Sequence, residues 1–331
     1  EMIHNRIAVL CGHLHLQPAS GTRSWCGSST HAVMGEVPSP PQLQEQWCRY
    51  QVHQRCLQAL WIHPPQTAAD PPLVDPPPLV FLHEGLGSIS HWKDVPKKVV
   101  AATGHPALVF ERLGFGRSDG LGPQEACSEH GLPRRRDYLQ QEATYWMPEV
   151  LQQAGVKGPC ILIGHSDGAS IALLYAAAFP EQVCGLVSEA AHVIVEQEAL
   201  QGIRKAREAF DAPGSRLRQS LCRIHGDKVD TTFSGWADVW LHPSFHDLDL
   251  VPQLSNITCP SLILQGEQDE YGTQKQVDLI AENVHGPCEW WMVPHCQHVP
   301  HLEAGNLVLP RMVEFIRSLP LPNPTKKGGV Q

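Results

Sequence analysis

The stretch Cys160-Ile-Leu-Ile-Gly-His-Ser-Asp-Gly-Ala-Ser-Ile-Ala-Leu-Leu-Tyr175 decides the fold of this chain. An apolar run ends in Gly-His-Ser-Asp-Gly, and a helical pattern follows at once, which predicts a strand, a sharp turn and a helix. Glycines at 164 and 168 let the strand and the helix pass closely, because neither residue carries a Cβ atom. We expect Ser166 at the tip of a strained turn (residues 164–168, the serine turn), with the N–H of Asp167 free to meet an anion. The alternative is a purely structural Gly-Ser-Gly turn.

Short apolar runs alternate with helical patterns along the rest of the chain. They predict an α/β fold with a mostly parallel, doubly wound sheet covered by helices on both faces. Strands are expected at residues 79–83, 107–111, 160–164, 184–188, 261–265 and 289–293, after a hairpin over 47–63. Helices are expected over 136–154 and 306–318.

Residues 191–245 contain helical patterns and no strong strand, which predicts a helical lid (residues 191–245) over one edge of the sheet. The core then comprises residues 46–190 and 246–320. Residues 1–45 and 321–331 lack a sustained hydrophobic period and are expected to be poorly packed tails.

The composition limits the classes of partner. A net charge of −9 disfavours a nucleic-acid role. The sequence has no run of about 18 apolar residues and no visible signal peptide, so no membrane segment is expected. Eleven cysteines lie singly, without C-x-x-C pairs, which indicates reduced thiols and a cytoplasmic location. The sequence gives no indication of the oligomeric state.

Three histidines follow the strand at 289–293, where open α/β sheets place their sites. A serine hydroxyl needs a base to take its proton, and we interpret His298 as that base. His295 is a rival, and His301 is interpreted as a supporting residue. The H-x-x-H-x-x-H spacing also invites a zinc reading, but Pro294 and Pro300 predict a loop, so no metal site is expected.

An acidic residue must orient the base, and Asp269 follows the strand at 261–265. Its place between Ser166 and His298 in chain order favours this role over a surface carboxylate. Glu267 and Glu270 are interpreted as solvated surface charges.

A second N–H donor for a developing oxyanion is expected in His83-Glu-Gly-Leu-Gly-Ser88. Glycine frees the backbone to approach an alkoxide, so the N–H of Gly85 is the favoured donor and that of Leu86 the alternative. The run at 114–119 ends another strand. Arg112, Arg117 and Asp119 are interpreted as bracing its turn, with substrate binding as the alternative.

Together these strings resemble the α/β-hydrolase superfamily, over roughly residues 47–319: HEGLGSISHWKDVP, GFGRSDG, GHSDGASIALLYA, QGEQDEYGT and CQHVPHLE. They are similar to a bacterial group described as α/β hydrolases or esterases. The resemblance implies a triad of Ser166, Asp269 and His298, with oxyanion N–H groups from Gly85 and Asp167. Glu84 is a departure, because many members carry glycine there. A serine nucleophile separates the chain from epoxide hydrolases and haloalkane dehalogenases, which use aspartate.

These observations predict a serine hydrolase that cleaves small carboxylic esters without a cofactor. Hydrolysis of a C–C bond or an enol-lactone is the alternative chemistry, because it uses the same triad. A ligand-binding protein on the same fold is the alternative of another class. Substrate contacts are expected from Leu86, His165, Trp236 and Trp240, and Phe233 and Leu241 share the helical segment of the two tryptophans.

Overall fold

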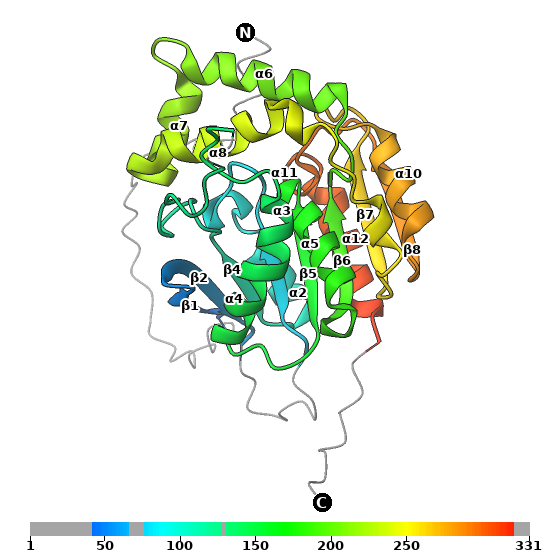
Figure 1. Cartoon of the computed structure of the whole chain (residues 1–331). Coiled ribbons are helices and arrows are strands. Elements are labelled where there is room, and N and C mark those ends of the chain that lie inside the picture. The colour runs from blue at the N-terminus through cyan, green and yellow to red at the C-terminus, as the bar shows by residue number, and fades with distance from the viewer. Residues whose placement is uncertain (1–41, 66–75, 128–129, 321–331) are drawn as a thin grey trace, which may run out of the picture.

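The computed structural model describes residues 42–65, 76–127 and 130–320 (Figure 1). The expected C-terminal tail and residues 1–41 of the expected N-terminal tail lie outside the described residues. The first strand begins at Gln44, so the expected boundary between residues 45 and 46 falls inside this strand.

The described residues form an eight-stranded sheet in the order β1-β2-β4-β3-β5-β6-β7-β8. The outer pairs β1–β2 and β2–β4 are antiparallel, and the other neighbours are parallel. The strands are β1 (Gln44–Val52), β2 (Arg55–His63), β3 (Leu79–Leu82), β4 (Ala107–Phe110), β5 (Cys160–His165), β6 (Val183–Glu189), β7 (Ser261–Gly266) and β8 (Cys288–Val293). Each expected strand is present.

Alternate residues of the buried strands feed two hydrophobic clusters, one on each face of the sheet. Along β3, for example, Val80 and Leu82 belong to one cluster, whereas Leu79 and Phe81 belong to the other. The helices are α2 (Val95–Thr103), α3 (Tyr138–Gln141), α4 (Met147–Gln153), α5 (Asp167–Ala178), α6 (Gln197–Asp211), α7 (Arg216–His225), α8 (Val229–Leu241), α9 (Val251–Leu254), α10 (Gln274–Asn283), α11 (Pro300–Glu303) and α12 (Gly305–Ser318). Helices α2 and α12 cover one face, and α3, α4, α5 and α10 cover the other.

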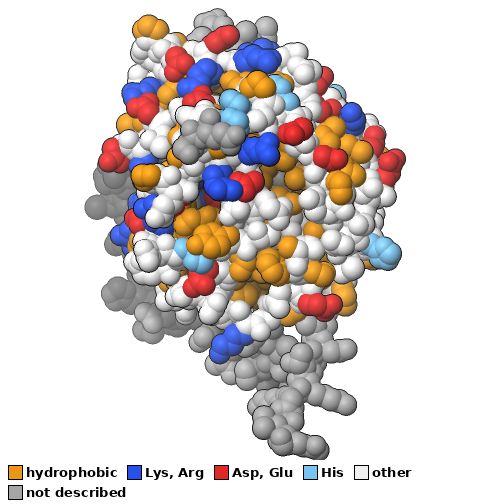
Figure 2. Space-filling model, in the orientation of Figure 1, with side chains coloured by type: hydrophobic (Ala, Val, Ile, Leu, Met, Phe, Trp, Pro, Cys, Tyr) orange, Lys and Arg blue, Asp and Glu red, His pale blue; other side chains and the backbone are white. Residues whose placement is uncertain are grey.

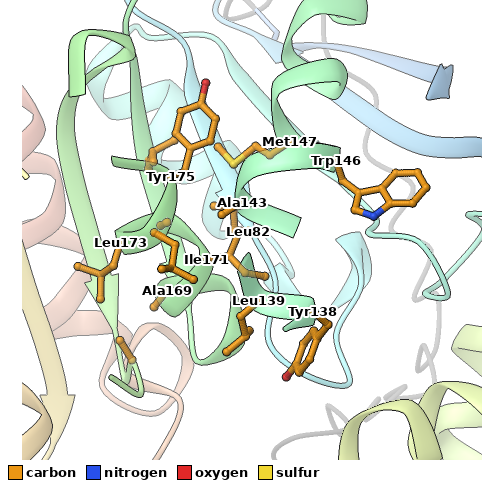
Figure 3. Packing of buried hydrophobic residues seen from close by; sticks show 14 of the residues in the cluster. Leu82, Tyr138, Leu139, Ala143, Trp146, Met147, Ala169, Ile171, Leu173 and Tyr175 are labelled. Atoms are coloured by element: carbon orange, nitrogen blue, oxygen red, sulfur yellow. The ribbon is translucent and has the colours of Figure 1, made fainter. Parts of the chain in front are cut away.

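The single helix expected over 136–154 is instead α3, a π-helical turn at Glu142–Trp146, and α4. Pro148 has no N–H to donate to the carbonyl four residues earlier, so the regular ladder is interrupted here. The interruption leaves Ala143 and Met147 directed toward α5, where Ile171 and Tyr175 belong to the same buried cluster (Figure 3).

The lid contains α6, α7 and α8, which gather over one end of the sheet at the top of Figure 1. An antiparallel bridge between Ile194 and Asp249 joins the two chain segments that enter and leave the lid. Beside it, the N–H of Leu250 donates to the carbonyl of Val193 at 2.8 Å. The base of the lid is therefore fastened by backbone hydrogen bonds.

Three features of the described residues relate to the expectations about partners and location: the surface charge, the cysteines and the hydropathy of the helices. On the face shown in Figure 2, lysine and arginine side chains lie among acidic ones rather than in one basic patch. The nine cysteines of the described residues are all free thiols. Among the helices of those residues, none is long and apolar enough to cross a membrane.

Two glycines allow the serine turn to form. A Cβ atom on Gly168 would lie 2.0 Å from the carbonyl oxygen of Leu82 in β3. A Cβ atom on Gly164 would lie 2.4 Å from the carbonyl oxygen of Gly168. Both contacts are to backbone atoms, which no side-chain rotation can relieve.

We therefore expect Gly168→Ala to lower the free energy of unfolding by about 3 kcal/mol, because the methyl group must push α5 away from β3. Urea denaturation measures the change. Gly158→Ala is the matched control, because no atom lies within 4 Å of its added Cβ. Equal stabilities of the two variants would contradict the packing described here.

Candidate active site

The backbone of Ser166 is strained. Its φ of 53° and ψ of −120° lie in a region that L-residues rarely adopt, at a cost on the order of 1–3 kcal/mol. The N–H of Ser166 donates to the carbonyl of Glu189 at 2.8 Å, and the carbonyl of Ser166 accepts from Ala169 and Ser170 at the start of α5. These bonds hold the turn, which presents the Ser166 side chain at the end of β5.

Ser166, His298 and Asp269 form a hydrogen-bonded chain. The Nε2 atom of His298 lies 3.0 Å from the Oγ of Ser166. The Nδ1 atom of His298 lies 2.9 Å from both carboxylate oxygens of Asp269. A carboxylate only accepts, so Nδ1 carries the proton and Nε2 is free to take one from the serine. This is the geometry by which a base activates a serine hydroxyl.

Charges around the chain favour that protonation pattern. Burial lowers the pKa of His298, but the carboxylates of Asp269, Glu270 and Glu303 raise it more, so the pKa lies above its ordinary value. Burial raises the pKa of Asp269, but His298 and the N–H of Tyr271 lower it more. Asp269 is therefore ionised at neutral pH and can stabilise an imidazolium.

The two expected oxyanion donors border the same pocket as Ser166. Asp167 is the first residue of α5, and the first N–H groups of a helix have no partner within it. Gly85 lies in a turn that is closed by a hydrogen bond from the N–H of Gly87 to the carbonyl of Glu84, at 3.0 Å.

The pocket contains about 420 Å³ of space between atoms, and this figure includes space that is open to solvent. Its walls combine polar groups from the core with apolar side chains from the lid. The lining residues are Glu84, Gly85, Leu86, Ser166, Asp167, His192, Ala199, Ile203, Trp236, Trp240, Tyr271 and His298. Leu86, Trp236 and Trp240 thus lie where substrate contacts are expected. Phe233 and Leu241 are not among the lining residues, and Phe233 stacks on Phe210 with ring centroids 3.8 Å apart.

His165 was expected to contact substrate, but the structure places it outside the pocket lining. Its Nε2 atom donates to the carbonyl of His298 at 2.7 Å, so the ring lies behind the serine turn. The Nδ1 atom of His165 lies 3.9 Å from the Oε2 atom of Glu84. The other carboxylate oxygen of Glu84 lies 3.8 Å from Nδ1 of His91. Burial raises the pKa of Glu84, but these two histidines lower it more, so the net shift is strongly downward. His165 thus supports the loop that carries His298.

The histidine triplet after β8 does not converge on one point. His298 faces Ser166, whereas the Nδ1 atom of His301 lies 2.6 Å from the carboxylate of Glu189. His301 lies in the short helix α11, with Pro300 as its first residue, so the expected loop is wrong for these residues. Within the described ranges, no three His, Cys, Asp or Glu side chains gather as metal ligands.

The turn after β4 is braced partly as expected. The carboxylate of Asp119 accepts from the N–H of Cys56 at 2.7 Å, and the N–H of Arg117 donates to Glu111. Arg112 instead reaches the active site, where Nη2 donates to the carbonyl of Glu84 at 2.8 Å and lies 3.8 Å from a carboxylate oxygen of Asp167.

A buried polar chain beside the pocket has no counterpart in the sequence analysis. The indole N–H of Trp240 donates to the hydroxyl of Tyr138 at 2.8 Å, and that hydroxyl donates to the Oδ2 atom of Asp167 at 2.6 Å. Burial raises the pKa of Asp167 more than Arg112 and Tyr138 lower it. Tyr138 and Trp240 lie far apart in the sequence and share no motif, so no sequence signal links them.

Comparison with known proteins identifies the family of this chain. The sequence model described as the alpha/beta hydrolase family matches residues 79–309. Proline iminopeptidase of Saccharolobus solfataricus is 26% identical over 277 residues, which cover 72% of this chain and 84% of that protein.

Solved structures share the fold. The proline iminopeptidase of Mycobacterium smegmatis superposes with a TM-score of 0.59 at 17% identity, covering 82% of this chain and 97% of that one. The enol-lactonase of Burkholderia xenovorans LB400 gives a TM-score of 0.60 at 15% identity, covering 81% and 99%. The eight-stranded, mostly parallel sheet with its flanking helices is therefore an α/β-hydrolase fold.

Replacing Ser166 or His298 with alanine should reduce kcat by similar factors, on the order of thousands-fold or more, because such residues act as a unit. Steady-state kinetics and thermal melts measure activity and folding. His295→Asn is the control, since His295 is exposed and asparagine tolerates its φ of 55°. Near-normal activity of His298→Ala together with inactivity of His301→Ala would show that His301, and not His298, is the base.

The pH profile should report the Asp269–His298 pair. Catalysis needs neutral His298, and its pKa is raised, so the acid limb of kcat/KM should have its midpoint above about 6.5. Asp269→Asn removes the carboxylate that raises this pKa, so the midpoint of the residual activity should move to lower pH. A midpoint that stays in place or rises in Asp269→Asn would show that Asp269 does not face the base.

Proposed function

Because the chain belongs to the alpha/beta hydrolase family and is a hydrolase, we propose that it cleaves small carboxylic esters through an acyl-enzyme on Ser166. One observation carries the proposal, namely the hydrogen-bonded chain from Asp269 through His298 to Ser166, with distances of 2.9 and 3.0 Å. A serine with a purely structural role has no need of such a chain, whereas acyl transfer depends on it.

In the proposed reaction, the Oγ of Ser166 attacks the ester carbonyl while Nε2 of His298 takes its proton. The N–H groups of Gly85 and Asp167 donate to the oxyanion. The C–O bond to the alcohol then breaks, and the imidazolium returns its proton to the departing alkoxide. Water, deprotonated by His298, repeats the sequence on the acyl-enzyme and releases the acid. No step uses a metal or an organic cofactor.

The side chains that the lid contributes to the pocket favour an apolar acyl group in the proposed ester. Ala199 and Ile203 of α6 and Trp236 of α8 border the space above Ser166. Aliphatic and indole side chains favour a carbon chain or a ring over a charged group.

Release of an N-terminal residue from a peptide is the second candidate. The similarity to an archaeal proline iminopeptidase over 72% of the chain supports it. The candidate shares Ser166, Asp269 and His298 with ester hydrolysis.

A substrate panel tests these possibilities. Purified protein and Ser166→Ala are assayed on p-nitrophenyl acetate, butyrate and octanoate, on proline p-nitroanilide, and on a C–C substrate such as a 2-hydroxy-6-oxodienoate. The proposal expects Ser166-dependent turnover that is fastest on the short esters. Faster turnover of the anilide or the dienoate would assign the chain to that chemistry instead. Absence of Ser166-dependent turnover on every substrate would favour a ligand-binding protein.

We also propose a cytoplasmic location. The free thiols of the described residues support it, because the cytosol keeps cysteines reduced. Several of these thiols are buried, and burial raises the pKa of Cys259 to about 11, which makes that thiol unreactive.

Shortening a lid side chain should change substrate preference. Ile203→Ala opens space beside Ser166, so kcat/KM for butyrate relative to acetate should rise about tenfold, the range for one or two methylene groups in an apolar pocket. Leu217→Ala is the matched control, because Leu217 is buried in the lid but does not line the pocket. An unchanged preference in Ile203→Ala would contradict the placement of the acyl group against α6.

A further inference from the structure

His225, the last residue of lid helix α7, connects the lid to two loops of the core. Its side chain is buried, with Nδ1 2.9 Å from the N–H nitrogen of Gly116 and Nε2 3.0 Å from the carbonyl oxygen of Leu86. A backbone N–H can only donate, so Nδ1 is the acceptor. The proton must then lie on Nε2, which donates to Leu86.

The neutral ring that these two bonds require is the form that the surroundings favour. Burial lowers the pKa of His225 to about 4, although the carbonyl of Leu86 opposes the shift. The ring is therefore uncharged at neutral pH, with one donor and one acceptor, and it satisfies both loops at once.

The carbonyl that His225 holds belongs to the turn that contains Gly85. This turn spans Glu84 to Gly87, so a bond to the Leu86 carbonyl opposes rotation of the adjacent peptide units. Trp236 of α8 covers the same turn from the pocket side, since a Cβ atom on Gly85 would lie 2.4 Å from its Nε1 atom. Two lid residues thus contact this turn, in addition to the bonds that the core residue Arg112 and the N–H of Gly87 make to the carbonyl of Glu84.

The other proposed oxyanion donor is also held from the lid. Trp240 of α8 donates to the hydroxyl of Tyr138, which donates to the side chain of Asp167. Asp167 carries the second N–H group at the start of α5. Each half of the oxyanion site is therefore reached by a hydrogen bond that begins, directly or through one tyrosine, on a lid helix.

We propose that the lid positions both oxyanion donors, with His225 as the positioning residue for Gly85 and the Trp240–Tyr138 pair for Asp167. This inference rests on the proposed ester hydrolysis and adds a role for the lid beyond covering the substrate. Loss of a lid bond should weaken binding of the transition state, and hence kcat, more than binding of the substrate.

The test compares His225→Gln with His225→Met, two side chains of similar shape that differ in their polar atoms. Glutamine retains a donor and an acceptor, and methionine has no donor. With p-nitrophenyl acetate, His225→Met should lose at least about tenfold in kcat with KM changed less than about twofold, and His225→Gln should recover most of the loss. A boronic acid, which forms a tetrahedral adduct on the serine, should bind His225→Met more weakly by a similar factor.

Thr232→Val is the matched control. Thr232 of α8 donates to the carbonyl of Gly114 at 2.6 Å, so the substitution removes a bond between the lid and the core that does not involve the Gly85 turn. It should lower the melting temperature and leave kcat unchanged. Tyr138→Phe tests the second arm, since Tyr138 does not line the pocket, and it should lower kcat and boronate affinity without changing KM.

Several outcomes would overturn the inference. Equal kcat for His225→Met and the unaltered protein would do so, as would a kcat loss in Thr232→Val as large as that in His225→Met. If His225→Met does not fold, wild-type kcat in Tyr138→Phe overturns the claim that the lid positions both donors. Failure of the proposed function looks different, because the unaltered protein itself would then show no Ser166-dependent hydrolysis.

Discussion

Ser166 holds a backbone conformation, φ 53° and ψ −120°, that an L-residue keeps only when its surroundings enforce it. The enforcement comes from the contact between β3 and α5, where Gly168 leaves no room for a Cβ atom beside the Leu82 carbonyl. The core therefore maintains the strain, and the strain directs the hydroxyl toward His298. His298, Gly85 and Asp167 border the same pocket as the serine side chain that this turn presents.

Buried carboxylates, Asp269 and Glu84, lie on two sides of the serine turn. In front of it, the ionised Asp269 keeps the ring of His298 oriented and raises its pKa. Behind it, His165 ties the carbonyl of His298 to the region of the Glu84 carboxylate. Fixed dipoles and charges in a water-poor site cost little reorganisation during reaction, which is the general basis of electrostatic catalysis. The same arrangement leaves few polar groups that can be removed without consequence.

The sequence predicts the part of this site that local patterns encode. Ser166, Asp269 and His298 each follow a short apolar run, so their positions at the ends of parallel strands could be inferred from chain order alone. His225 and Tyr138 could not, because their roles arise from contacts with Leu86 and Asp167 that only the folded chain creates. The surroundings of His165 could not be inferred either: it is next to Ser166 in the sequence, but its ring bonds to the carbonyl of His298 and is not among the pocket-lining residues. The interruption of the helix over 136–154 could have been inferred, because Pro148 stands in the sequence and has no N–H to donate.

Labelling with a fluorophosphonate, followed by intact-mass and peptide mass spectrometry, tests the central claim that Ser166 is an activated nucleophile. The account predicts one adduct per chain, located on Ser166, when the native protein is labelled. Protein that is denatured before the probe is added should form none, because the strained turn and the aligned His298 are then gone. An unlabelled native protein, or an adduct on another residue, would contradict it.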